Sequence, residues 1–404
     1  MDLGAFTSLI SANNKIMKEV PFARVDCSGN ELAYVKEVLD SGWLTTASKS
    51  NALENAFKDM IGAEHTITVN SCTSALHLAL DACGVGEGDK VLIPSLTFTA
   101  TAEVVRYMGA ELVLIDVEPD TACISKRIVQ EALIDHPDAK AVVAVHYGGY
   151  PIQMSGEDGL ADFCKEVGLK LISDAAHALP AKRNGVYIGY EGDVTCLSFY
   201  ANKTMTTGEG GMLLTNDDEI AKRVRLMRLH GIDRDVWKRF TASSNQWEYD
   251  VLAPGFKYNM PDINAAVGLA QFERLEEMRA SRQKIAEFYI SKFAGCNEFS
   301  ILPQLVPSED HAWHLFPLFI NEKSAVNRNE FIEKMSDLGI GTSVHYKPIH
   351  QLTYYKERYQ LKADNYPTAE KTWKSCVSLP IYNLLTSEDM EYVADSVIKI
   401  VKNG

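Results

Sequence analysis

The feature that most constrains the fold is a regular alternation of short apolar runs with amphipathic stretches in the first half of the chain. The apolar runs typical of strands cover residues 65–69, 90–93, 111–116, 141–146, 169–173 and 194–200. The helical patterns between them cover residues 75–80, a stretch after Thr97, 128–134 and 159–166. This order predicts an α/β fold with a mostly parallel sheet covered by helices on both faces. Ligands of such sheets bind at the carboxyl ends of the strands.

The length of the chain predicts more than one structural unit, because 404 residues exceed the size at which a single core usually stops growing. We expect an N-terminal extension at residues 1–20 and a large domain at 21–262. Residues 263–404 are expected to form a linking helix and a smaller α+β C-terminal domain.

Further elements are predicted outside the alternating region. An amphipathic pattern predicts a helix that starts after Ser28 or Asn30 and ends near Ser41, and a second helix is expected over residues 51–60. The linking helix is predicted as one continuous helix over 263–293, and the loop around Trp237 and Trp247 as irregular. The C-terminal strand candidates are 313–320 and 341–346, and the helix candidates there are 328–338 and 387–401.

Charge and cysteine usage narrow the class of protein. A net charge of −14 argues against binding to a nucleic-acid backbone or an anionic membrane, since both need clustered Lys and Arg. The eight cysteines show no CxxC pair and no metal-ligand spacing, which predicts reduced thiols, a cytoplasmic location and no metal site. No signal peptide and no membrane span are expected, because long apolar runs are missing from the sequence.

Three predicted strand ends carry groups that could do chemistry. Lys203 lies in a stretch of small, hydroxyl and glycine residues after the strand at 194–200, although most lysines in loops are simply exposed. Asp174 follows the strand at 169–173, where it could also be an N-cap. The turn Asn70-Ser71-Cys72-Thr73-Ser74 leads from a strand into a helix, and such a turn is either an anion site or an ordinary capped helix.

Together these three groups match the needs of pyridoxal 5′-phosphate. A lysine amine can form a Schiff base with the aldehyde, an aspartate can keep the pyridine nitrogen protonated, and a helix start can hold the phosphate. Each signal is weak alone, but their order along the chain indicates a cofactor site.

Six blocks of the sequence resemble the DegT/DnrJ/StrS family of pyridoxal phosphate-dependent nucleotide-sugar aminotransferases. They are NSCTSALHLAL, PSLTFTATAEVV, VHYGG, ISDAAHA, SFYANKTMTTGEGG and GFKYNMPDINAAVGLAQ. The resemblance extends from about Val20 to the C-terminus. It implies the fold type I aminotransferase fold and a homodimer with shared active sites.

The resemblance also implies roles for individual residues. Lys203 would be the Schiff-base lysine and the acid/base that moves the proton, and Asp174 would pair with the pyridinium nitrogen. His177 would approach the 3-hydroxyl of the ring, and Phe98 would lie against the ring. The phosphate would be held by three residues of the same chain and by Asn259 of the second subunit, with Lys257 as the rival for that last role. The three residues are Thr73, Ser74 and Ser198.

Four segments resemble the branch of the family that aminates C4 of a UDP-linked 4-keto sugar, as in the aminoarabinose-lipid A and pseudaminic acid pathways. They are SGWLTT, GFKYN, HAWHLF and VHYKPIHQLTYY. The resemblance implies L-glutamate as amino donor and a sugar-nucleotide side lined by Trp313, His345, Tyr346, His350 and Tyr355. Core packing is the alternative for each of these five. Alternative functions are amination at C3, a dTDP- or GDP-sugar or a free cyclitol as substrate, and a non-catalytic regulatory protein that binds the cofactor.

Overall fold

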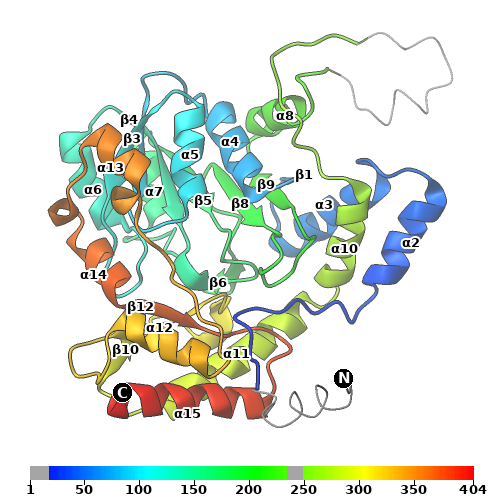
Figure 1. Cartoon of the computed structure of the whole chain (residues 1–404). Helices are drawn as coiled ribbons and strands as arrows, with labels where there is room; N and C mark the ends of the chain where they lie inside the picture. Colours follow the sequence, from blue (N-terminus) through cyan, green and yellow to red (C-terminus); the bar gives the residue numbers. More distant parts are fainter. Residues whose placement is uncertain (1–17, 234–248) are drawn as a thin grey trace, which may run out of the picture.

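The computed structural model describes residues 18–233 and 249–404, so the predicted loop around Trp237 and Trp247 lies outside the described residues. A seven-stranded sheet forms the centre, in the order β1-β9-β8-β5-β4-β2-β3 (Figure 1). Only β9 runs antiparallel to its neighbours, which confirms the mostly parallel sheet. The strands are β1 (His65–Val69), β2 (Lys90–Pro94), β3 (Glu111–Ile115), β4 (Ala139–Val145), β5 (Lys170–Asp174), β8 (Val194–Ser198) and β9 (Gly211–Thr215).

The helices of this region lie at the places that the alternation predicts. They are α4 (Cys72–Ala82), α5 (Thr99–Tyr107), α6 (Lys126–Asp135), α7 (Leu160–Val167) and α8 (Asp218–Met227). Consecutive residues of β8 and β9 are buried, so both faces of these strands are covered. A small hairpin of β6 (Lys182–Arg183) and β7 (Val186–Tyr187) stands apart from the main sheet.

Two helices precede the sheet. Of the two N-caps considered for α2 (Glu31–Ser41), Asn30 holds the position, but its side chain bonds Glu273 and not the helix. The helix ends at Gly42, whose φ of 69° is the left-handed conformation that glycine adopts easily. The second helix, α3 (Ser48–Ile61), starts earlier than the predicted range.

The predicted continuous helix over residues 263–293 is wrong. The chain forms α10 (Asp262–Phe272) and α11 (Leu275–Lys292), separated at Glu273 and Arg274. Arg274 donates to Asp26 Oδ2 at 2.8 Å and to Ser28 Oγ at 3.0 Å, contacts made with the N-terminal segment. The apolar pattern of the sequence continues through residues 273 and 274, so the pattern does not reveal the break. The break is seen only together with these contacts to the N-terminal segment.

The C-terminal part has its own antiparallel sheet and its own hydrophobic core. The predicted strand at 341–346 is wrong, because Ser343 makes only an isolated bridge with Ser378. The strand predicted over 313–320 begins at Phe316. The elements of this part are β10 (Phe299–Ile301), β11 (Phe316–Ile320), β12 (Cys376–Leu379), α12 (Arg328–Asp337) and α15 (Ser387–Asn403). Between them in the sequence lie α13 (Thr353–Tyr359) and α14 (Pro367–Ser375), which bury Tyr355 and Ala369 in the core of the large sheet.

The first described residues pack against this C-terminal core. Val20 is 1% exposed and pairs with Ile340, and Lys18 lies 2.9 Å from Asp389. The domain boundaries at residues 20 and 262 stay a prediction. Among the described residues, no helix is long and apolar enough to cross a membrane.

Candidate active site

Three strands of one direction deliver the predicted groups to the same edge of the sheet. β5 ends on Asp174, β8 ends on Ser198 before the loop that carries Lys203, and β1 leads into the turn before α4. β5 and β8 are parallel neighbours, and β1 lies beyond β9 with the same direction as β8. The carboxyl ends of these strands therefore form one site.

Lys203 lies partly buried at this edge. Its Nζ is 3.4 Å from His314 Nε2. Burial lowers the pKa of the Lys203 ammonium to about 8, whereas nearby Cys72 and Asp174 act to raise it. About a tenth of the amine is therefore neutral at pH 7, much more than for an ordinary lysine, and the neutral amine is the form that attacks an aldehyde.

Asp174 is a buried carboxylate with few partners. Its Oδ2 accepts a hydrogen bond from Thr101 Oγ1 at 2.9 Å, and its Oδ1 accepts one from the Ala176 N–H at 3.2 Å. Burial raises the pKa of Asp174, and the two hydrogen bonds oppose this effect. A cationic N–H of a bound ring would stabilise the carboxylate form.

His177 is held in one tautomer by its neighbours. The Gly148 N–H donates to Nδ1 at 3.3 Å, so the proton of the neutral ring belongs on Nε2. Nε2 lies 2.9 Å from Tyr346 Oη and donates to it. Burial, with Lys203 and His345 nearby, lowers the pKa of His177 well below its usual value, so the ring is neutral.

The turn before α4 has the geometry of a helix N-terminus. Ser71 is the N-cap, and its Oγ accepts from the Ser74 N–H at 3.0 Å. Ser74 Oγ donates to Asn70 Oδ1 at 2.6 Å. Thr73 is half-buried in the first turn, and Gly211 of β9 approaches so closely that a Cβ there would lie 2.6 Å from the Cys72 backbone nitrogen. These backbone contacts fix the N-terminal end of the helix beside Ser198, the β8 partner of Gly211, and a helix N-terminus can bind an anion.

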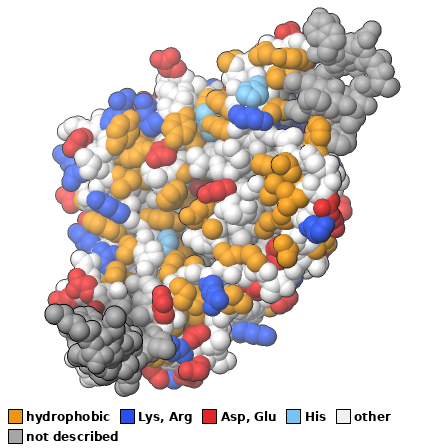
Figure 2. All heavy atoms as spheres, turned by 45° about the vertical axis from the view of Figure 1, so that its right-hand side comes forward, with side chains coloured by type: hydrophobic (Ala, Val, Ile, Leu, Met, Phe, Trp, Pro, Cys, Tyr) orange, Lys and Arg blue, Asp and Glu red, His pale blue; other side chains and the backbone are white. Residues whose placement is uncertain are grey.

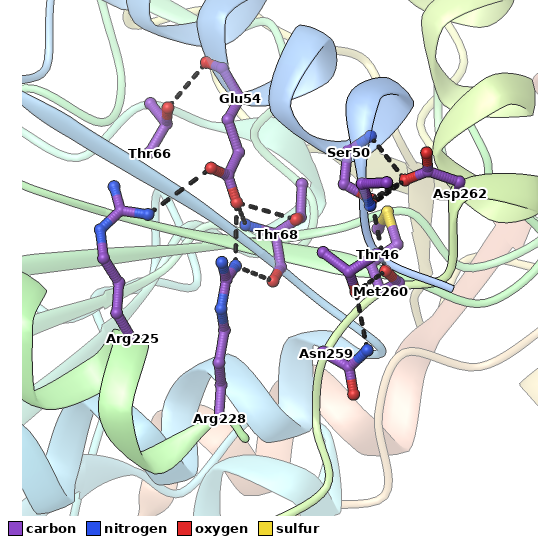
Figure 3. Close-up of polar contacts among 11 residues, drawn as sticks. Thr46, Ser50, Glu54, Thr66, Thr68, Arg225, Arg228, Asn259, Met260 and Asp262 are labelled. Atoms are coloured by element: carbon purple, nitrogen blue, oxygen red, sulfur yellow. Dashed lines mark hydrogen bonds and ion pairs between the residues drawn. The ribbon is translucent and has the colours of Figure 1, made fainter. Parts of the chain in front are cut away.

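Asn259 does not contact this turn through its side chain in its own chain. Its Nδ2 donates to Thr46 Oγ1 at 2.7 Å (Figure 3). Its Oδ1 accepts from Lys257 Nζ at 2.6 Å. Thr46 in turn donates to the Met260 carbonyl at 2.5 Å. Asn259 and its rival Lys257 therefore bond each other at the surface, and a role in a second subunit stays a prediction.

The residues predicted on the substrate side divide into two groups. Two of the five, His345 and Tyr346, lie at the site, together with Phe98, which was predicted against the cofactor ring. Tyr346 contacts His177, and the Phe98 ring is 5.9 Å from the Tyr346 ring. The pKa of His345 is lowered to about 4 by burial and by Lys203. His345 Nδ1 also bonds Ser378 Oγ at 2.9 Å. These three placements are compatible with ligand contact.

The other three predicted substrate residues lie in packed regions. Trp313 is 3% exposed, belongs to the C-terminal core and donates its indole N–H to the Ser308 carbonyl. His350 is 1% exposed and is satisfied by Ser95 at 2.5 Å and Glu370 at 2.9 Å. Tyr355 is 4% exposed in the core of the large sheet. Core packing, the alternative considered for these residues, matches these placements.

Two residues of the site carry no role in the sequence prediction. His314 contacts Lys203, and its ring lies 4.3 Å from that of His177. Thr101 bonds Asp174. The segment HAWHLF, which contains His314, was the available signal, but nothing in its spacing distinguishes His314 from Trp313.

The described residues fit pyridoxal 5′-phosphate. The donor set contains an amine with a pKa of about 8, a buried carboxylate that lacks a cationic hydrogen-bond partner among the described residues, and a helix N-terminus for an anion. Lys203, Asp174 and the start of α4 would hold its aldehyde carbon, ring nitrogen and phosphate.

Comparisons with known proteins agree with this reading. The family model of the DegT/DnrJ/EryC1/StrS aminotransferases matches residues 26–398. The spore coat polysaccharide biosynthesis protein SpsC of Bacillus subtilis is 39% identical over 387 residues, which cover 95% of this chain and 98% of SpsC.

Solved structures are also similar. The putative sugar aminotransferase Spr1654 of Streptococcus pneumoniae in its PMP form has 29% identity and a TM-score of 0.85, with 95% of this chain and 99% of that chain covered. Helicobacter pylori PseC, an aminotransferase involved in the biosynthesis of pseudoaminic acid, has 26% identity and a TM-score of 0.86, with 96% and 100% covered. The chain thus belongs to the DegT/DnrJ/EryC1/StrS aminotransferase family and is a pyridoxal phosphate-dependent sugar aminotransferase of fold type I.

Proposed function

We propose that the enzyme transfers an amino group from L-glutamate to C4 of a UDP-linked 4-keto sugar for the synthesis of a surface polysaccharide or glycan. The observation that carries the transferase chemistry is the convergence of Lys203, Asp174 and His177 at one sheet edge. The names of SpsC and PseC, which refer to a spore coat polysaccharide and to pseudoaminic acid, support a sugar of this kind.

Each residue of the site has a proposed task. When bound, pyridoxal 5′-phosphate supplies an aldehyde that takes up amines and a ring that withdraws electrons from the reacting carbon. Lys203 would hold the cofactor through its Nζ at the aldehyde carbon, and its free amine would move the proton to and from the substrate carbon. The Asp174 carboxylate would keep the ring nitrogen protonated, and the neutral His177 ring, oriented by the Gly148 contact at Nδ1, would approach the 3-hydroxyl side.

We propose the remaining contacts in the same way. Ser198 Oγ, Thr73, Ser74 and the N–H groups at the start of α4 hold the phosphate. Phe98 lies against the ring. His345 and Tyr346 face the sugar side.

We further propose a homodimer in which Asn259 reaches the phosphate of the partner's site. In support, α2 carries an outward apolar row, with Leu32 84% and Leu39 55% exposed. Figure 2 looks at the side of the molecule on which α2 and α10 lie, and hydrophobic side chains gather over part of that face. A row of this kind is typical of a surface covered by another chain. The eight cysteines, all free, are in keeping with the proposed cytoplasmic location.

The cofactor assignment is tested by reduction of the loaded protein with borohydride, followed by peptide mass analysis. We expect pyridoxyl phosphate on Lys203, none in Lys203→Ala, and unchanged labelling in Lys222→Ala, since Lys222 is exposed. Attachment at another lysine would contradict the proposal.

The substrate is tested with glutamate and a panel of 4-keto and 3-keto sugars linked to UDP, dTDP or GDP, with product mass and NMR as readout. We expect the UDP-linked 4-keto sugar to react fastest. If a 3-keto sugar, a dTDP- or GDP-linked sugar or a free cyclitol reacts faster, that compound replaces the UDP-linked 4-keto sugar as the proposed substrate. Cofactor binding without any glutamate-dependent change in absorbance would favour a regulatory protein.

A further inference from the structure

The contact between Lys203 and His314 is not explained by the roles assigned above. His314 is 5% exposed, and its Nε2 is 3.4 Å from Lys203 Nζ. Its Nδ1 is buried without a hydrogen-bond partner among the described residues. The distance to Lys203 is long for a hydrogen bond, as is common in active sites before a ligand binds.

The segment that carries His314 is docked on the loop that follows β4. The Ala312 N–H donates to the Gly149 carbonyl and the Leu315 N–H to the Gly148 carbonyl, each at 3.1 Å. Gly149 has a φ of 102°, and a Cβ there would lie 3.1 Å from the His314 nitrogen and 3.0 Å from Ala312 Cβ. Glycine avoids both the backbone strain of this φ and these tight contacts. The VHYGG block therefore places His314 against the residues at the ends of β5 and β8.

A buried arginine holds the same segment from the other side. Arg282 of α11 donates to the carbonyl oxygens of Ile381 at 2.8 Å, Trp313 at 3.4 Å and His314 at 3.5 Å. Trp313 adopts a φ of 49°, a left-handed conformation that is unfavourable for a residue with a Cβ. Such a conformation persists only where the surroundings impose it, and it is frequent at functional sites. Here it turns the chain so that Trp313 enters the core while His314 reaches Lys203.

The protonation state of His314 follows from its surroundings. Burial, with Lys203 and His177 as the next causes, lowers the pKa of His314 well below its usual value, so the ring is neutral. A neutral ring that faces an amine can offer the lone pair of Nε2, with its proton on Nδ1.

We propose that His314 is a positioning residue for Lys203: its Nε2 accepts a hydrogen bond from the lysine amine and keeps Nζ beside Asp174 and His177 whenever the amine is not bonded to the cofactor. The inference rests on the proposed function of Lys203. It explains why the chain accepts an unfavourable Trp313 backbone and a buried Arg282 at this place. Without an acceptor, the flexible side chain of a released lysine would occupy several rotamers, and its proton would reach the substrate carbon less often.

Several charged or titratable groups share the surroundings of Lys203. They are Cys72 of α4, Asp174 of β5, Arg282 of α11, and the neutral rings of His177 and His345. None of these changes in the variants below, so a shift in the lysine pKa reports the side chain at position 314.

The test measures the amine itself in the full-length protein without cofactor. Lysines are labelled by reductive methylation from neutral to alkaline pH, and the rate at Lys203 is read by peptide mass. The wild-type profile is expected to have its midpoint near the lowered pKa of about 8. In His314→Leu the midpoint should fall by about one pH unit, because the lost hydrogen bond stabilises the ammonium more than the amine. In His314→Gln, whose amide oxygen can replace Nε2, it should stay at the wild-type value.

Two further measurements complete the test. Exposed Lys222 serves as the internal control, and its profile should be identical in all variants. If His314→Leu does not fold, His314→Asn replaces it, because its shorter amide cannot reach Lys203. With cofactor, glutamate and sugar present, we expect the Leu variant to lose about tenfold in kcat with a similar KM, and the Gln variant to recover most of it.

A midpoint that does not fall in the variants without an acceptor, or that falls equally in the Gln variant, would overturn the proposal. This outcome is independent of the proposed reaction, because the labelling uses no cofactor. Failure of the borohydride attachment at Lys203 would refute the proposed function while leaving the measured amine profile intact.

Discussion

Glu54 and Arg228 form a buried ion pair of 2.9 Å that takes the place of a neighbouring strand at the open edge of β1. Glu54 Oε1 accepts from the Thr68 N–H at 2.8 Å, and Arg228 Nη1 donates to the Thr68 carbonyl at 2.8 Å (Figure 3). Both backbone groups of Thr68 point away from β9 and are satisfied by side chains. The pair thereby holds the strand that leads to the turn before α4.

We predict that Glu54→Gln lowers the free energy of unfolding by about 3 kcal/mol, because it leaves Arg228 buried without a charge partner. The measurement is urea unfolding followed by circular dichroism. The matched control is Glu131→Gln, which removes an exposed carboxylate paired with Arg127 and should change stability by less than about 0.5 kcal/mol. Equal effects of the two substitutions would contradict the role given to the buried pair.

Gly149→Ala should destabilise the protein more than Gly156→Ala. Both glycines have positive φ, 102° and 87°, so both variants lose about 1 kcal/mol from backbone strain. Only at position 149 does the new Cβ meet the His177 carbonyl and the His314 nitrogen, each at 3.1 Å, which adds about 2 kcal/mol. Differential scanning calorimetry checks the ranking. Indistinguishable melting curves of the two variants would show that the segment around His314 can shift to accommodate the new Cβ without loss of stability.

Thr101→Val should weaken cofactor binding about tenfold at neutral pH. The variant removes the hydrogen bond to Asp174 Oδ2, which raises the pKa of that carboxyl further and disfavours the charged form proposed to pair with the ring nitrogen. Titration by absorbance gives the dissociation constant. Raising the pH should restore part of the affinity in the variant, because it favours the carboxylate. Thr99→Val, which loses a bond to Glu103 and leaves Asp174 and its partners unchanged, is the control that should bind normally.

The carboxyl of Glu370 should make the protein depend on pH in the acid range. Burial acts to raise the pKa of Glu370, but hydrogen bonds from His350, Lys374 and Gln351 outweigh it and lower the pKa to about 2. A group with a lowered folded-state pKa stabilises the protein above its ordinary value of 4.5, and this contribution is lost as the pH falls toward 2.

The difference in unfolding free energy between wild type and Glu370→Gln should therefore be on the order of 2 kcal/mol at pH near neutrality and shrink below the ordinary carboxyl pKa. Urea unfolding of both proteins at a series of pH values measures this difference in unfolding free energy. A difference that stays constant through the acid range would show that the contribution is not ionic.

Much of the sheet edge that carries Asp174 and Lys203 could be predicted from the sequence, because it depends on the local pattern of apolar and polar residues. β1 was predicted with its observed bounds, and the placement of Asp174 and Lys203 after buried strands needed only the alternation of apolar runs with helical stretches. The break between α10 and α11 could not be predicted, since it accompanies contacts between Arg274 and residues almost 250 positions earlier in the chain. The sequence offers no glycine or proline there.

The substrate side shows the same limit. Trp313 and His314 are adjacent, and no pattern tells which one faces the site, because a backbone turn at positive φ decides it. The sequence predicts that His350 contacts the substrate, but in the structure both of its ring nitrogens bond to protein side chains, Ser95 and Glu370. Polar residues of this kind are assigned by their partners in space, which one sequence does not reveal.

The docking of residues 312–315 on Gly148 and Gly149 has a mechanical consequence. His314 belongs by sequence to the C-terminal part, but its backbone is attached to the central sheet, so the seam between the two cores runs through the neighbourhood of Lys203. A ligand that shifts the C-terminal core against the sheet would change the proton affinity of the amine without touching it. The proton affinity of Lys203 would then depend on whether the sugar substrate is bound between the two cores.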